Sequence, residues 1–230
     1  MSSATITTSA RLMNSTPQTE EQAMVRKVAV SSFLGNFIEW FDYASYSYFA
    51  TTIALVFFPT DNHTVAMLQT FGVFALSFIL RPIGALFWGS YGDKKGRKAA
   101  LAHSIMFMSG ASFLIGCLPS YSVIGVGAPI LLLLLRMVQG FSASGEYAGA
   151  ATFLGEYAPT SKRGIYCSLI PASTAIGLLA GSTLATLMTA NMNSSAMVGW
   201  GWRVPFLLAG PLGLIVLYIR AKLADSPVYQ

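Results

Sequence analysis

The feature that most constrains this chain is a series of long apolar stretches, each separated from the next by a short hydrophilic segment. Every stretch reaches the roughly 20 residues that an α-helix needs to cross about 30 Å of hydrocarbon. Half-buried helices of soluble proteins show a polar face, which these stretches lack. The sequence therefore predicts an all-α polytopic membrane protein with six transmembrane helices, near residues 28–57, 65–91, 99–118, 129–155, 164–190 and 203–223.

Composition agrees with this class and excludes others. Hydrophobic residues make up 54% of the chain and charged residues only 10%, which is too apolar for an ordinary soluble core. The net charge of +5 comes from cations in short gaps, without the basic stripe that a nucleic acid requires. No metal-ligand spacing, phosphate loop or nucleophile motif is present in the sequence. We therefore expect no nucleic-acid partner, no enzymatic activity, no metal and no other cofactor.

The distribution of Lys and Arg predicts the orientation. Loops 58–64, 119–128 and 191–201 contain neither residue, whereas the opposite side receives Arg11, Arg26, Lys27, Lys94, Lys95, Arg97, Lys98, Lys162, Arg163, Arg220 and Lys222. Because short cytoplasmic loops are enriched in these cations, both termini of this chain are expected in the cytoplasm. Residues 1–25 lack the apolar region of a signal peptide and are interpreted as a disordered cytoplasmic tail, followed by a transmembrane domain over residues 26–230.

Polar residues inside the first apolar stretch indicate a transport path. Residues three or four positions apart share one face of a helix, and that spacing recurs at Asn36, Glu39, Tyr43 and Tyr46, with Asp42 at the edge of the face. Intramembrane charges cost about 2.5–3.5 kcal/mol each on insertion scales and usually face a cavity or a partner. Ionising both Glu39 and Asp42 in a dry site is unfavourable, so we expect at least one to bind a proton. The alternative is a structural partner for Asp42, either a hydroxyl or an arginine.

The fourth stretch has a similar polar face, which holds Arg136, Gln139, Glu146 and Tyr147 within a sector of about 100°. Arg136 is placed to balance a carboxylate of the first helix, and Glu146 to take and release a proton. A purely structural ion pair is the alternative, since buried pairs also hold bundles together. Arg81 lies in an apolar stretch as well, and we expect it to snorkel to the cytoplasmic interface about 12 Å away.

The densest charge in the chain is the sequence GSYGDKKGRK at residues 89–98. A cytoplasmic loop explains its cations but not its carboxylate or its spacing, which involves Gly89, Asp93, Lys94, Gly96, Arg97 and Lys98. This pattern resembles the signature between helices two and three of the major facilitator superfamily. The resemblance implies that the first glycine lets two helices approach closely, and that the aspartate and arginine form a latch at the cytoplasmic gate. The alternative is a solvated charged turn.

Longer segments resemble one branch of this superfamily, the metabolite:proton symporters. They read GNFIEWFDYASYSYFA, RPIGALFWGSYGDKKGRK, RMVQGFSASGEYAGAATFLGEYAP and WGWRVPFLLAGPLGLIVLYIR. The motif Arg136-x-x-Gln139-Gly140 matches a second superfamily signature, whose arginine is tied to proton coupling. The resemblance implies import of a small osmoprotectant zwitterion, such as proline or glycine betaine, across a bacterial inner membrane on the proton gradient. The alternative substrate is an organic acid of the α-ketoglutarate, citrate or shikimate class.

Zwitterion binding requires a cation for the carboxylate and ring faces for a quaternary ammonium, with each ring worth roughly 0.5–2 kcal/mol. The predicted substrate-binding residues are Asn36, Trp40, Tyr43, Tyr46 and Tyr147. Arg136 is the predicted carboxylate anchor.

The length of the chain predicts an incomplete transporter. Members of this superfamily have two six-helix halves with the substrate between them near the midplane. The chain ends where the family begins its central loop, so we interpret it as the N-terminal half. Its expected partners are the C-terminal six-helix half, the lipid bilayer, protons and the small-molecule substrate. The alternative is a truncated, non-transporting half or assembly module.

Overall fold

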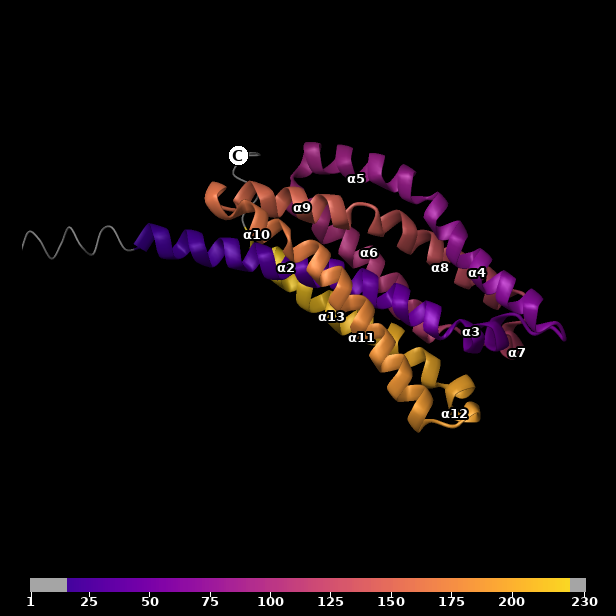
Figure 1. Ribbon diagram of the computed structural model, residues 1–230. Coiled ribbons are helices and arrows are strands. Elements are labelled where there is room, and N and C mark those ends of the chain that lie inside the picture. The colour runs from indigo at the N-terminus through magenta and orange to yellow at the C-terminus, as the bar shows by residue number, and fades with distance from the viewer. Residues whose placement is uncertain (1–15, 224–230) are drawn as a thin grey trace, which may run out of the picture.

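The computed structural model describes residues 16–223, which form an elongated bundle of helices (Figure 1). The α-helices in chain order are α2 (Thr16–Tyr48), α3 (Ala50–Phe57), α4 (His63–Ile79), α5 (Arg81–Lys95), α6 (Arg97–Cys117), α7 (Tyr121–Ile124), α8 (Gly127–Ala143), α9 (Glu146–Tyr157), α10 (Arg163–Cys167), α11 (Leu169–Asn191), α12 (Ser194–Gly199) and α13 (Val204–Ala221). Two short 3-10 helices, η1 (Thr160–Lys162) and η2 (Gly201–Arg203), complete the described elements. The predicted all-α class is confirmed.

Six long segments match the predicted apolar stretches, and several of them are broken. The first comprises α2 and α3, the second α4 and α5, the third α6, the fourth α8 and α9, the fifth α10 and α11, and the sixth α13. The break between α4 and α5 has a local cause. Pro82 stands in the first turn of α5, where its missing N–H is tolerated, and it cannot continue the helix of α4.

The first helix begins earlier than predicted. Because α2 starts at Thr16, the prediction of a disordered tail is wrong for residues 16–25. The sequence TEEQAMVRK at residues 19–27 consists mostly of strong helix formers, so the helix of the apolar stretch extends through it. The remainder of the predicted tail, residues 1–15, lies outside the described residues.

The outer surface of the bundle suits a lipid environment. Among the described residues, five helical segments are long and apolar enough to cross a membrane. Large side chains point outward from them, such as Leu86, Leu179 and Leu214, which are 79%, 66% and 68% exposed. The first segment is not among the five, and its middle carries Asn36 and Glu39.

The centre of the bundle is built around α2, which packs along α11, α13 and α9. Figure 1 shows α3, α7 and α12 at one end of the bundle and α10 at the other. A core cluster that includes Phe57, Trp202 and Phe206 fills the end near α3, and another that includes Leu101 and Phe153 fills the end near α10. The polar residues described below lie between these clusters.

Glycines bring the helices close together. A Cβ atom at Gly140 of α8 would lie 1.9 Å from the carbonyl oxygen of Ser77 in α4. A Cβ atom at Gly177 of α11 would lie 2.8 Å from the carbonyl oxygen of Phe37 in α2. Only a residue without a side chain permits such contacts, which are the usual basis of helix packing in lipid.

We expect Gly140→Ala to destabilise the full-length protein strongly. Overpacking typically costs about 1–3 kcal/mol, and the obstructing atom here belongs to the backbone of α4, so it cannot move without moving the helix. The apparent unfolding temperature of protein purified in detergent measures the effect. Gly72→Ala is the matched control, because no atom lies within 4 Å of the added Cβ. Equal unfolding temperatures for the two variants would contradict the close contact.

Candidate functional site

The interior of the bundle contains three ion pairs, each joining a carboxylate to an arginine of another segment. The first is Asp42 of α2 with Arg136 of α8, at 2.6 Å between Oδ2 and Nη1. The other Asp42 oxygen accepts hydrogen bonds from Gln139 Nε2 at 3.1 Å and from Ser112 Oγ at 3.0 Å. This carboxylate therefore connects α2, α6 and α8.

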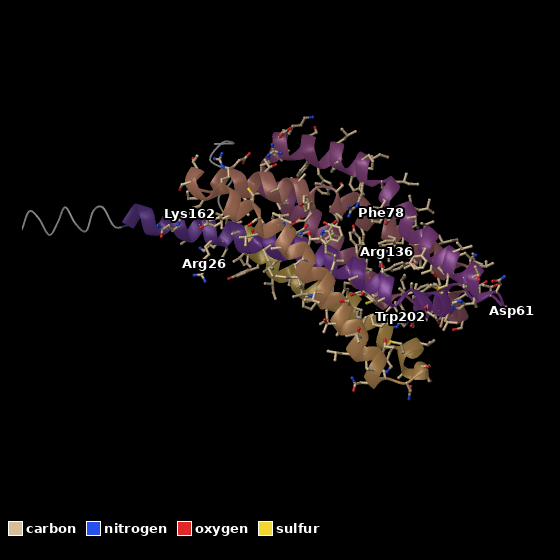
Figure 2. The ribbon with its side chains drawn as sticks, viewed as in Figure 1. Arg26, Asp61, Phe78, Arg136, Lys162 and Trp202 are labelled. Atoms are coloured by element: carbon tan, nitrogen blue, oxygen red, sulfur yellow. The ribbon has the colours of Figure 1, made fainter. Side chains whose placement is uncertain are left out.

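Arg136 is enclosed on the sides that Asp42 leaves open. Its guanidinium lies 3.8 Å from the centre of the Tyr46 ring and 5.5 Å from that of Phe206. Figure 2 shows Arg136 in the interior of the bundle, and its side chain is 1% exposed. Among the described residues, Asp42 is the one carboxylate that forms an ion pair with Arg136.

The second pair joins Glu146, the first residue of α9, to Arg220 in the last turn of α13. Both side chains are 1% exposed. Arg220 also donates to the carbonyl oxygens of Leu101 and Ser31, and Ser104 Oγ donates to Glu146. A Cβ atom at Gly35 would lie 2.0 Å from Glu146 Oε1, so this glycine of α2 leaves the space that the pair occupies.

Arg220 stands in the last turn of α13, two residues before Lys222, and is buried inside the bundle. Its burial assigns it to an ion pair but does not move it to the other end of the bundle, so the predicted side of this cation stays a prediction.

The third pair joins Glu39 of α2 to Arg81, the first residue of α5. The same guanidinium nitrogen donates to the hydroxyl of Tyr43. The central carbon of the Arg81 guanidinium lies 5.1 Å from the centre of the Tyr43 ring and 4.7 Å from the centre of the Phe78 ring. The expectation that Arg81 snorkels is therefore wrong. Because α5 continues to Lys95, the charged end of this helix lies about 21 Å from Arg81 by helix rise, beyond the reach of the side chain.

The two acidic residues in the apolar part of α2, Glu39 and Asp42, do not share one site. Glu39 faces α5 and Asp42 faces α6 and α8, and each has its own arginine. The closest charge to each carboxylate is therefore the positive charge of its own arginine, and not the negative charge of the other carboxylate.

The structure separates the predicted substrate-binding residues. Asn36 donates to Ile170 O, Ser173 Oγ and Thr174 Oγ1 of α11, and is fully buried there. The Tyr46 hydroxyl donates to Thr70 O of α4 at 2.9 Å. Both residues therefore fasten α2 to its neighbours.

The remaining three have different surroundings. Trp40 and Tyr43 pack edge to face, with ring centres 5.8 Å apart, beside Glu39 and Arg81. Tyr147 is 45% exposed on α9, and among the described residues it makes no ring contact with the others. Of the predicted set, Trp40 and Tyr43 thus stay together near a charged pair.

The charged motif lies at the junction of α5 and α6. Asp93 Oδ1 and Arg97 Nη2 are 3.1 Å apart, and the aspartate side chain is 66% exposed. Gly96 has a φ of 96°, a conformation that side chains rarely adopt, and this turn lets α6 begin directly after α5. Lys98 Nζ donates to Ala221 O at the end of α13. Lys94 is exposed.

The first glycine of the motif does not make the expected close contact within the described residues. A Cβ atom at Gly89 would meet no atom within 4 Å. The close approach on this helix is at Gly84, where a Cβ atom would lie 2.2 Å from Phe141 O. Gly89 stands five residues further along α5, on another side of the helix, where it is half-buried beside a groove that Leu101 and Gly149 also line.

Sequence reasoning missed two of the three arginines. A charge balance would have found them: three carboxylates were recognised within the apolar stretches, but only Arg136 was assigned as a counter-ion. Since isolated charges are rare in a membrane interior, Glu39 and Glu146 required partners as well. Ser104 and Ser112 gave no signal, because serines also occur in apolar helices without a polar partner.

Comparisons with the sequences of known proteins identify the family of this chain. The family described as sugar (and other) transporter matches residues 27–230. The chain is 42% identical over 210 residues to the proline/betaine transporter of Salmonella typhimurium, covering 91% of this chain and 42% of that protein. It is also 42% identical over 210 residues to the glycine betaine/proline/ectoine/pipecolic acid transporter OusA of Dickeya dadantii, with the same coverage.

Solved structures show the same fold. The major facilitator superfamily proton:xylose symporter XylE superposes with a TM-score of 0.80 at 16% identity, over 91% of this chain and 46% of that one. The inward open conformation of XylE from E. coli gives a TM-score of 0.77 at 17% identity, over 89% of this chain and 49% of that one. The chain thus spans less than half the length of these relatives. It belongs to the sugar and other transporter family, within the major facilitator superfamily.

Proposed function

We propose that this chain forms one half of a secondary active transporter that imports a small osmoprotectant zwitterion, such as proline or glycine betaine, together with protons. The observation that carries the proposal is Asp42, a sealed carboxylate bound by residues of two other segments. Protonation of Asp42 would remove the counter-ion that Arg136 has in the described part of the chain, so it would alter contacts among three helices at once. The names of the relatives support the choice of substrate.

The charge balance favours a zwitterion over a dicarboxylate. Each of the three arginines in the middle of the bundle is matched by a carboxylate. A dicarboxylate needs surplus positive charge, and cavity carboxylates would repel it. A zwitterion adds no net charge to such an interior.

Uptake by the full-length protein tests the proposal. Radiolabelled proline, glycine betaine, ectoine and α-ketoglutarate would be supplied to a strain that lacks transporters for them. Accumulation of proline or betaine that collapses with the proton gradient is the expected result. Accumulation of α-ketoglutarate alone would assign the protein to the organic-acid class, and a full-length protein that accumulates none of the four would favour a non-transporting role.

We also propose that both ends of this chain face the cytoplasm of a bacterial cell, and that a second half covers part of its surface. The proton gradient supplies the energy, so no cofactor is required. The cation-free loops at the α3, α7 and α12 end of the bundle support this orientation.

Cysteine labelling is expected to confirm the orientation. After Cys117 and Cys167 are replaced by serine, cysteines at Asp61 and Ser194 should react in intact cells with a membrane-impermeant thiol reagent, because both positions are exposed at the cation-free end. Asp61 is preferred to Asn62, whose side chain caps α4. A cysteine at Lys95, which is equally exposed, should react only in opened cells. Its labelling in intact cells would reverse the orientation.

A further inference from the structure

The three ion pairs differ in their access to the surface. The side chains of Asp42 and Arg136 are 4% and 1% exposed, and the Glu146–Arg220 pair is equally enclosed. Arg81, in contrast, is 27% exposed while its partner Glu39 is 2% exposed. Among these pairs, only Glu39 and Arg81 can be reached by a ligand without opening the bundle.

The open pair lies at the depth where a transported substrate is expected. Arg81 stands about 21 Å from the Lys95 end of the second segment and about 27 Å from its His63 end by helix rise. It is therefore near the middle of a segment that crosses the membrane. Substrate sites of transporters built from two repeats lie near the bilayer midplane, between the halves.

The surroundings of this pair already accommodate a cation and a carboxylate. The Arg81 guanidinium lies over the rings of Tyr43 and Phe78, and Trp40 packs against the edge of Tyr43. Phe78 is 40% exposed, and Figure 2 places it on the α4 side of the bundle. Aromatic faces of this kind bind ammonium groups as well as guanidinium groups.

The pair also has unused hydrogen-bonding capacity. Glu39 Oε2 and Arg81 Nε are buried atoms without a hydrogen-bond partner among the described residues, as is Trp40 Nε1. Buried polar atoms usually have a partner, so these three leave the cluster able to bind a polar ligand. Arg136 Nε and Nη2, Gln139 Oε1 and Arg220 Nε also lack a partner among the described residues, so the partial exposure of Arg81 is what distinguishes this pair from the other two.

We propose that Glu39 and Arg81 form the two charged ends of the substrate subsite, and that a zwitterion binds by inserting between them. This inference rests on the proposed function. The carboxylate of the ligand pairs with Arg81, and its ammonium group lies against Glu39 and the rings of Trp40 and Tyr43. One ion pair is thus replaced by two, and the net charge of the site stays at zero.

Arg81 replaces Arg136 as the carboxylate anchor in this proposal. Arg136 is held by Asp42 and lies against Tyr46 and Phe206, so a ligand would have to displace several buried groups to reach it. Arg81 has one carboxylate partner and a partly exposed, flexible side chain. It can therefore exchange partners with little change in the bundle.

Two analogues of glycine betaine test the two ends separately in the full-length protein. Choline keeps the trimethylammonium group and lacks the carboxylate, whereas 3,3-dimethylbutanoate keeps the carboxylate and has carbon in place of nitrogen. The measured quantities are the concentrations of each that inhibit uptake of labelled betaine by half, relative to unlabelled betaine. Arg81→Gln should reduce the preference for betaine over choline roughly ten- to a hundredfold, the usual effect of losing a hydrogen bond to a charged group. It should preserve the preference over 3,3-dimethylbutanoate.

Glu39→Gln should have the opposite effect, reducing the preference for betaine over 3,3-dimethylbutanoate and preserving that over choline. A purely structural pair would not change the two ratios in opposite directions. Arg81→Lys keeps a cation and should retain most of the preference over choline, which tests the anchor if Arg81→Gln is poorly inserted. Arg203→Gln is the matched control, because Arg203 is partly buried but donates to Gly116 O and Leu118 O at the end of α6. It should change neither ratio.

The failures are distinguishable. If the unaltered protein imports betaine and neither ratio moves in the Glu39 and Arg81 variants, the subsite is wrong and the proposed function stands. If the unaltered protein imports neither betaine nor proline, the proposed function is overturned and the subsite with it.

Discussion

Replacing Asp42 with asparagine should abolish proton-driven accumulation of substrate by the full-length protein. Asparagine resembles the protonated carboxyl group in shape but cannot bind or release a proton. Substrate should therefore only equilibrate across the membrane, whereas exchange of external labelled substrate for internal unlabelled substrate should continue. The two measurements are uptake driven by an imposed pH gradient and exchange in its absence. Continued accumulation by Asp42→Asn would show that another carboxylate, Glu39 or Glu146, carries the proton.

A second variant separates coupling from folding. Asp42→Asn leaves Arg136 buried without a counter-ion, and breaking a buried pair in this way costs about 3–5 kcal/mol. The double variant Asp42→Asn with Arg136→Gln removes both charges, so more of it should reach the membrane. We expect the double variant to be inserted at nearly the normal level and still to lack accumulation. Recovery of accumulation in the double variant would contradict the assigned role of Asp42.

Replacing Glu146 with glutamine should destabilise the protein by about 3–5 kcal/mol, because it leaves the buried charge of Arg220 uncompensated. Arg220→Met should also destabilise it, since Glu146 then loses its partner. Combining the two should cost less than the sum, because neither charge remains to be compensated. Unfolding of the purified full-length protein in denaturant measures all three. A fully stable Glu146→Gln variant that has lost proton coupling would instead identify Glu146 as the proton carrier.

The geometry explains why the two buried pairs are expected to differ. Arg220 donates to two backbone carbonyl oxygens as well as to Glu146, and Gly35 provides space for the pair. These contacts tie α13 to α2, α6 and α9, so a structural role accounts for all of them. Arg136 donates to Asp42 and to no backbone oxygen of the described residues, so its position depends on the charge of Asp42.

Local properties of the sequence predicted the all-α class and six apolar stretches, of which five lie in helical segments that are long and apolar enough to cross a membrane. Each stretch of about 20 residues must be apolar on its own to lie in the hydrocarbon, so the hydropathy of the sequence is enough to predict the stretches. Breaks within segments were not predicted, although Pro82 accounts for one of them. The early start of α2 was missed because a polar, helix-forming sequence before an apolar stretch has the same composition as a disordered tail.

Particular residues show where sequence reasoning failed for the candidate site. Asp42 and Arg136 were both recognised, because an ionisable residue in the middle of an apolar stretch stands out. Arg220 was counted only as a cation of one side of the membrane, because nothing in the sequence reveals that Glu146 is opposite. Asn36 and Tyr46 were assigned to substrate, and the sequence did not reveal that each donates to a backbone carbonyl of a neighbouring helix.

The sequence by itself determined which residues are too polar for lipid, and therefore which side chains require a partner. Only the tertiary structure decided which partner each one has. Pairing depends on the rotation and depth of each helix relative to its neighbours, and these are set by close contacts such as that of Gly140 with Ser77. Helix contacts of this kind involve residues far apart in the chain, so the exposure of Arg81 and the burial of Arg220 follow from packing rather than from local sequence.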